Sequence, residues 1–209
     1  MRLGGALTRA AIATSVALAG ACATGGNVHL PGSVAPRPEV TSAVPPMSIL
    51  WSATRRLAWT DFQAPPQMGS EAAAITAYAI TYEATCDGSS LNARIVSAFL
   101  PEQSWVKPAL LVRGPQSENA LNHEQTHFDL SEVSVRRMRK KLKDLDDPCR
   151  RKPDDLYALV DPIISEDGEA QRRYDLETAN GRDPASQAKW DSSVARDLRA
   201  LAKYAWDFR

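Results

Sequence analysis

His123-Glu124-Gln125-Thr126-His127 is the most informative segment of this 209-residue chain, and it holds two of the chain's three histidines. On an α-helix, a spacing of four residues places His123 and His127 on one face, about one turn apart. Both imidazoles can then bind one cation, with Glu124 beside them in the sequence. This pattern is typical of zinc proteases, in which the carboxylate polarises a metal-bound water and carries its proton. The pentapeptide therefore predicts a helix, a Zn²⁺ site and Glu124 as general base and acid.

The residues around the pentapeptide also indicate a helix, over about residues 118 to 145. Ser117 or Asn119 can cap its start. Apolar residues recur along it with a helical period: Ala120, Leu121, Phe128, Leu130, Val133, Val135 and Met138. Basic residues gather in its later part, where they complement the helix dipole: Arg136, Arg137, Arg139, Lys140, Lys141 and Lys143. We expect these basic residues on a solvated face; a patch for an anionic partner is the alternative.

Five segments occur in the order seen in the bacterial DUF922 family of predicted secreted zinc-dependent proteases. They are Leu57–Phe62, Ser104–Val106, His123–Asp129, Tyr174–Thr178 and Gln187–Trp190. The chain resembles this family over about residues 49 to 205. The resemblance implies a zincin-like domain that hydrolyses peptide bonds in a peptide or protein substrate. The chain departs from the family pattern at Asn180, where the family has a histidine followed by glycine.

The third zinc ligand is open from the sequence. A catalytic zinc usually takes three protein ligands, and His29 lies in a stretch that we expect to be flexible. A carboxylate is therefore expected, with Glu177 preferred and Asp175 as the alternative. Glu177 shares a predicted helix face with Tyr174 and Asn180, whereas Asp175 lies on another face.

Two roles are open for Tyr174 as well. Its phenol could hydrogen-bond a tetrahedral oxyanion, or it could be a buried structural tyrosine.

If the family histidine is itself a ligand, Asn180 would weaken metal binding. This keeps a second function open: a catalytically degenerate zincin-fold envelope lipoprotein that acts as a binding or scaffold module.

The N-terminus predicts export. Residues 1–22 have two arginines, Arg2 and Arg9, before an apolar run, Ala10–Ala21, that is too short to span a bilayer, which is the profile of a secretory signal. Leu18 to Cys22 resembles a bacterial lipobox, in which Cys22 would be lipidated and would anchor the protein to the membrane; simple cleavage after Ala21 is the alternative. Residues 23–46 are rich in Gly, Ser, Thr, Ala and Pro and predict a flexible linker. Residues 47–209 then form one domain in the periplasm or cell envelope.

Cysteine content agrees with export, and net charge bears on the kind of partner. With Cys22 set aside, Cys86 and Cys149 form an even pair, and we expect a disulfide in an oxidising compartment. A zinc role for them is less favoured because they lack the paired spacing of thiolate sites. The formal net charge of +0 argues against a nucleic-acid partner.

The rest of the sequence predicts an α+β domain, an N-terminal antiparallel sheet followed by three main helices. Ile75–Thr85 and Leu91–Leu100 read as a hairpin around the turn residues Asp87–Ser90. Trp51 and Leu57–Phe62 suggest another strand. Helices are expected over about residues 118 to 145, 154 to 179 and 186 to 206, the second with a possible interruption at Pro162.

Overall fold

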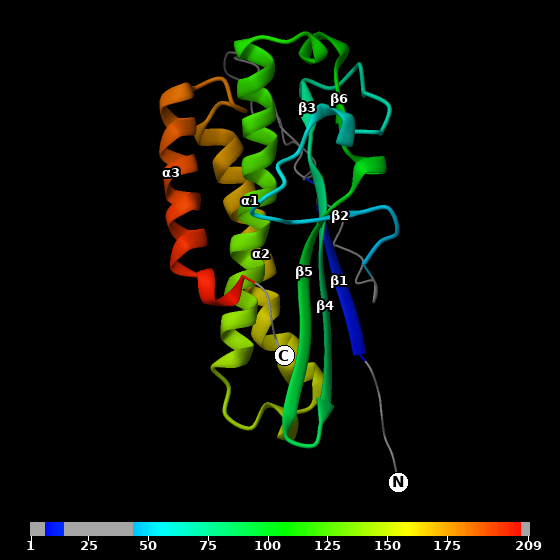
Figure 1. Cartoon of the computed structure of the whole chain (residues 1–209), viewed down its shortest axis with the longest axis vertical. Coiled ribbons are helices and arrows are strands. Elements are labelled where there is room, and N and C mark those ends of the chain that lie inside the picture. Colours follow the sequence, from blue (N-terminus) through cyan, green and yellow to red (C-terminus); the bar gives the residue numbers. More distant parts are fainter. Residues whose placement is uncertain (1–6, 15–43, 206–209) are drawn as a thin grey trace, which may run out of the picture.

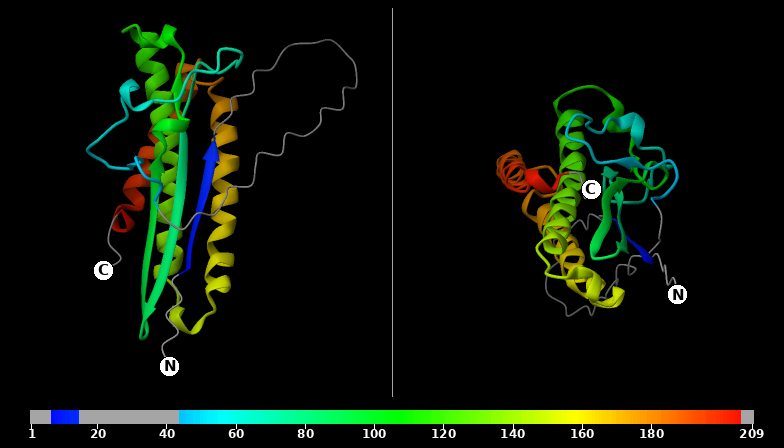
Figure 2. Two further views of the ribbon diagram at one scale, coloured as in Figure 1. Left: turned by 90° about the vertical axis from the view of Figure 1, so that its right-hand side faces the viewer. Right: turned by 60° about the horizontal axis from the view of Figure 1, so that its bottom comes forward.

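A computed structural model describes residues 7–14 and 44–205 of the chain. The fold is α+β, with a small antiparallel sheet on one side of three helices (Figure 1). The helices are α1 (Pro115–Lys143), α2 (Pro153–Glu177) and α3 (Pro184–Ala200). In Figure 1, α1 lies between α3 and the long hairpin of the sheet, and Figure 2 shows that hairpin running along the helices.

The main sheet has four strands, among them β1 (Leu7–Thr14) and β2 (Ile49–Leu50) at its two edges. Its strand order is β1-β4-β5-β2, and every neighbouring pair is antiparallel. Its centre is the hairpin of β4 (Ala77–Asp87) and β5 (Ser90–Phe99), whose two-residue turn contains Gly88 at φ +60°. Glycine adopts this left-handed conformation at no steric cost. The predicted hairpin is therefore confirmed. A second sheet has two short strands, β3 (Ala74–Ile75) and β6 (Trp105–Val106).

The edge strand β1 (Leu7–Thr14) lies within the predicted signal. Its backbone pairs with β4 from Leu7 opposite Ala84 to Thr14 opposite Ala77. Cleavage of residues 1–22 stays a prediction, and it would leave this edge of β4 without its partner strand. Cys22 and most of the predicted linker lie outside the described residues. Within the described part, no helix combines the length and apolar character that a membrane span requires.

The prediction of a strand at Leu57–Phe62 is wrong. Residues Trp59–Asp61 form a 3₁₀ turn, and the added strand is β2 (Ile49–Leu50), just before Trp51. The turn is fixed by Asp61, whose backbone N–H donates to the Ala58 carbonyl and whose carboxylate accepts from the Ala58 N–H, each at 2.8 Å. This local hydrogen bonding competes with strand pairing.

The three helices are confirmed, with differences at their ends. α1 begins at Pro115, before the expected caps, and the Ser117 hydroxyl instead donates to the Leu110 carbonyl at 2.6 Å. α2 continues through Pro162, which lies on an exposed position and lacks one helical N–H donor. α3 is capped by Asp183, whose carboxylate accepts from the backbone N–H groups of Ala185 and Ser186.

We expected the basic residues of α1 to lie on a solvated face, and this prediction is wrong for two of them. Arg136 and Arg139 are each 4% exposed, and both contact the buried carboxylate of Glu132. Arg139 also donates to the carbonyls of Ile95 and Tyr204, so it ties α1 to β5 and to the end of the chain. The other basic residues of the group are exposed: Arg137, Lys140, Lys141 and Lys143.

The predicted disulfide is present in the structure. Cys86 at the end of β4 and Cys149 after α1 have their Cα atoms 5.8 Å apart and form a bond. It joins the tip of the hairpin to the connection between α1 and α2.

α1 is surrounded over its middle turns. Residues 123–128 are six consecutive buried positions. One side packs Phe128 against Phe99 of the sheet, and another faces α2 and α3. Because burial without a hydrogen-bond partner is costly, the polar side chains of this segment need partners inside the molecule.

Candidate metal centre

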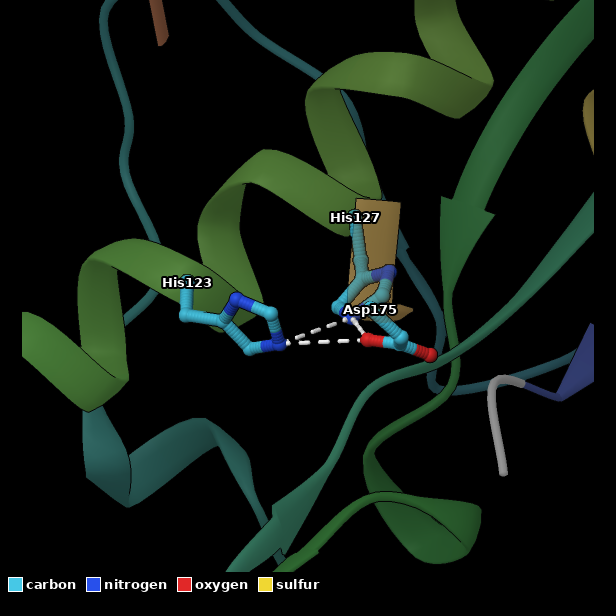
Figure 3. Close-up of side chains that lie close together, drawn as sticks. All are labelled: His123, His127 and Asp175. Atoms are coloured by element: carbon cyan, nitrogen blue, oxygen red, sulfur yellow. Dashed lines mark hydrogen bonds and ion pairs between the residues drawn. The ribbon is translucent and has the colours of Figure 1, made fainter. Parts of the chain in front are cut away.

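Two helices bring three metal-ligating side chains together. His123 and His127 lie one turn apart on α1, and Asp175 reaches them from the last turns of α2 (Figure 3). His127 Nε2 lies 2.9 Å from Asp175 Oδ1, His123 Nε2 lies 3.2 Å from the same oxygen, and the two Nε2 atoms are 3.2 Å apart. All three side chains are buried.

The other ring nitrogen of His127 fixes its tautomer. His127 Nδ1 lies 2.6 Å from Gln171 Oε1. The amide of Gln171 is itself oriented, because its Nε2 donates to the His127 carbonyl at 3.1 Å. The oxygen of Gln171 therefore accepts from Nδ1–H, and in the neutral ring Nε2 keeps a lone pair directed at Asp175.

His123 is held in the same way by α3. Its Nδ1 lies 3.2 Å from Gln187 Oε1, which also accepts from the Tyr174 hydroxyl at 2.8 Å. Gln187 Nε2 donates to Asp191 Oδ1 at 2.8 Å. Since an ionised carboxylate only accepts, Asp191 fixes which end of the Gln187 amide faces His123. Partners of this kind orient metal-bound histidines in proteins.

The three atoms have the spacing of a ligand set. Atoms bound to one tetrahedral zinc ion at about 2.0–2.2 Å lie about 3.3–3.6 Å from one another. The observed separations of 2.9, 3.2 and 3.2 Å are slightly shorter. Two imidazole lone pairs and a carboxylate oxygen repel one another at this distance unless a cation or a proton lies among them. Two imidazoles and a carboxylate are ligands that Zn²⁺ accepts.

The pKa values reflect the same crowding. Burial alone would lower the pKa of His127, but the adjacent Asp175 carboxylate outweighs it and raises that pKa to about 9. Burial would raise the pKa of Asp175, whereas the two neighbouring imidazoles hold it well below its usual range. Without metal, a proton on His127 takes the place of the cation.

Glu124 lies at the wall of a cleft of about 540 Å³ that His123, His127 and Asp175 also line. Its side chain is buried, and its Oε2 has no hydrogen-bond partner among the described residues. The main chain of Glu124 is anchored, because its carbonyl accepts from the Thr76 hydroxyl at 3.2 Å, next to β3. A buried carboxylate oxygen without a partner is poised to accept a proton or a hydrogen bond from a ligand in the cleft.

Tyr174 lies where a buried structural tyrosine would. It is fully buried, its ring stacks on His123 with centroids 4.6 Å apart, and its hydroxyl contacts Gln187 and the His123 carbonyl. It does not line the cleft. These contacts favour the structural role of Tyr174, and its contact with an oxyanion stays a prediction.

Of the two carboxylates considered as a third ligand, the structure brings Asp175, not Glu177, to the two histidines. Glu177 is half-exposed and accepts from Trp190 Nε1 at 2.9 Å, on the outer side of α2. The step of two residues from Asp175 to Glu177 turns the helix by about 200°, so only one of the two carboxylates can face α1. That carboxylate is Asp175.

The chain turns sharply where α2 ends. Ala179, Asn180 and Gly181 all have left-handed φ values of 50°, 55° and 75°. A Cβ built on Gly181 would lie 3.0 Å from the Cβ and Cγ atoms of His123, so this glycine lets the backbone pack against a candidate ligand. Asn180, which stands where the family pattern has a histidine, lines the cleft.

Sequence reasoning missed Gln171, Gln187, Asp191 and Gly181. One signal was present: Gln171 stands four residues before Asp175, on the same helix face. Another was Gln187, the first residue of one of the family-like segments. Gln187 and Asp191 pair four residues apart on α3. Only tertiary packing brings Gln187 to His123.

Fold and centre together define an α+β protein with a buried His-His-Asp cluster beside a glutamate. A family model described as "Bacterial protein of unknown function (DUF922)" matches residues 58–182, which include the cluster and Glu124. The chain therefore belongs to the DUF922 family. Searches of curated proteins and of solved structures give no significant match.

Proposed function

We propose that this protein is a zincin-like, zinc-dependent hydrolase of peptide bonds. His123, His127 and Asp175 would hold the ion, and Glu124 would carry the proton. The observation that carries the proposal is the convergence of three ligating atoms within 4.8 Å of one another, with the two Nδ1 atoms engaged by glutamines.

Each residue has a defined task in this proposal. A bound zinc ion would supply a Lewis acid that lowers the pKa of water and polarises a carbonyl group. Glu124 Oε2, buried at the cleft wall without a partner, would accept the proton of the attacking water and pass it to the leaving amine. Gln171 and Gln187 accept from the Nδ1–H groups, so in the neutral rings both Nε2 atoms would present lone pairs to the ion. No serine or cysteine nucleophile is required.

We also propose that the protein acts in the cell envelope on a peptide or protein substrate. The Cys86–Cys149 disulfide supports an oxidising compartment. Lipidation of Cys22 rests on the sequence pattern alone. The scaffold alternative has one feature in its favour, Asn180 in place of the family histidine.

The test compares the full chain with Glu124→Gln, which keeps the shape of the side chain and removes its basicity. Both proteins are purified without chelators, their zinc is measured, and both are incubated with a peptide library. We expect about one zinc per chain in each and a loss of hydrolysis of about 10²- to 10⁴-fold in the variant, the usual contribution of a general base. Equal turnover would contradict the role of Glu124. A stable, metal-free and inactive protein would favour the scaffold.

A further inference from the structure

We propose that Asn180 is a substrate-binding residue, whose side-chain oxygen accepts a hydrogen bond from a backbone N–H of a bound peptide. This inference rests on the proposed function and deepens it, because it names the group of the substrate that is recognised beside the metal centre. Three features of the turn after α2 carry it.

The first feature is backbone conformation. Ala179 and Asn180 are non-glycine residues with φ values of 50° and 55°. Side chains disfavour this region, and such conformations persist where the surroundings enforce them. Here the Asn180 N–H donates to the Asp175 carbonyl at 2.8 Å, and the Asp183 N–H donates to the Thr178 carbonyl at 2.9 Å. The turn is therefore built to hold Asn180 in one position.

The second feature is the unsatisfied oxygen. Asn180 Oδ1 is buried and has no hydrogen-bond partner among the described residues, although the residue itself is only partly buried. Most buried polar atoms have a partner, so an oxygen held without one calls for an external donor. Asn180 lines the same cleft as Glu124 and the three candidate ligands.

The third feature is the close approach of this turn to the metal centre. Gly181 lies so near His123 that a Cβ would stand 3.0 Å from its Cβ and Cγ atoms. The neighbour of Asn180 in the chain thus packs directly on a candidate ligand. Asn180 and the centre line one cleft, so a peptide bound there could contact both.

The chemistry of the oxygen selects the kind of ligand. A carbonyl oxygen accepts and does not donate, so it recognises a group with an N–H or O–H. A peptide offers a backbone N–H at nearly every residue. An ester in the same position offers no such donor, so Asn180 should make the site prefer an amide to its ester analogue.

The experiment uses the zinc-loaded full chain and three probes: a peptide hydroxamate and two analogues in which the first or second amide N–H, counted from the hydroxamate, is replaced by an ester oxygen. Dissociation constants are measured by calorimetry. For the wild type we expect the amide to bind about tenfold more tightly than one of the two esters, the effect of a well-formed hydrogen bond. In Asn180→Gly this ratio should fall to about twofold or less.

Glycine is the chosen replacement because it tolerates the left-handed backbone, so the turn is kept while the amide is removed. Asn119→Ala is the matched control, since Asn119 is an exposed amide that lines the same cleft. It should leave the ratio unchanged. A purely structural role for Asn180 would weaken all three probes equally, and an unchanged amide-to-ester ratio in Asn180→Gly would overturn the inference. Absence of binding by every probe would instead refute the proposed function, and this inference with it.

Discussion

Asp175 and Glu177 stand two residues apart in the sequence and differ completely in their surroundings. Asp175 Oδ1 lies 2.9 Å from His127 Nε2, whereas the Glu177 carboxylate pairs with Trp190 on the outer side of α2. The pair therefore offers a test of the ligand set with a control on the same helix end.

We expect Asp175→Ala to lower zinc affinity by more than about 100-fold, since the loss of an outer partner alone costs about 10- to 100-fold. Glu177→Ala should leave affinity nearly unchanged. Competition with a chelator measures both. The reverse ranking would move the third ligand to Glu177.

Gln187 orients His123 without facing the cleft. Gln187→Leu removes the acceptor for Nδ1–H, so the ring can place its proton on Nε2 and face the ion with a donor. We expect zinc affinity to fall about 10- to 100-fold, measured by the same competition. Gln116→Leu, an exposed glutamine at the cleft, is the control and should bind zinc as the wild type does. If Gln187→Leu keeps full affinity, the tautomer argument is wrong.

At the scale of elements, the centre depends on the turn after α2 lying against α1. Gly181 and Gly88 both have left-handed φ values, but only Gly181 has a neighbour that a methyl group would meet, the His123 ring. Each Gly→Ala change should cost about 1–2 kcal/mol for the backbone conformation alone. Gly181→Ala should in addition displace His123 and weaken zinc binding, while Gly88→Ala should not. Thermal unfolding and zinc titration of the two variants separate these effects, and equal zinc affinity in both would show that the contact with His123 is unimportant.

Some features of the helices and strands could be predicted from the sequence alone, and others could not. The hairpin and the three helices were predictable because local patterns decide them: alternation with a Gly88 turn in one case, a helical period in the other. The buried Arg136 and Arg139 were not, because an amphipathic pattern does not reveal that α1 is covered on several sides. Besides Glu132 on the same helix, their partners are backbone carbonyls far away in the sequence: Leu198 for Arg136, and Ile95 and Tyr204 for Arg139.

The residues of the candidate site also differ in whether the sequence alone could predict them. His123, Glu124 and His127 follow from one short segment with helical spacing. The choice of Asp175 over Glu177 depends on the rotation of α2 about its axis relative to α1, which spacing within α2 cannot fix. The support from Gln187 depends on the packing of α3, and the left-handed turn at residues 179–181 follows from hydrogen bonds that only the folded chain forms.

For the whole molecule, the coupling of His127 and Asp175 predicts how stability depends on pH. The pKa of His127 is raised from its ordinary value of 6.5 to about 9 in the folded, metal-free protein. Its protonated form therefore stabilises the fold fully below about pH 6.5, and this contribution is lost as pH rises through about 9. Zinc competes with that proton, so zinc affinity should rise with pH over the same range. We expect melting temperatures between these pH values to fall for the chelator-treated protein and to hold or rise for the zinc-loaded one. Parallel curves would contradict the coupling.

The proposed function requires one zinc ion held by two imidazoles and one carboxylate. X-ray absorption at the zinc edge, on the full chain loaded with one equivalent and dialysed, measures these ligands. We expect retained zinc whose nearest neighbours are nitrogen and oxygen atoms, with the multiple-scattering pattern of two imidazoles and no sulfur. Zinc that is lost on dialysis, or a spectrum with sulfur or with a single imidazole, would refute this ligand set.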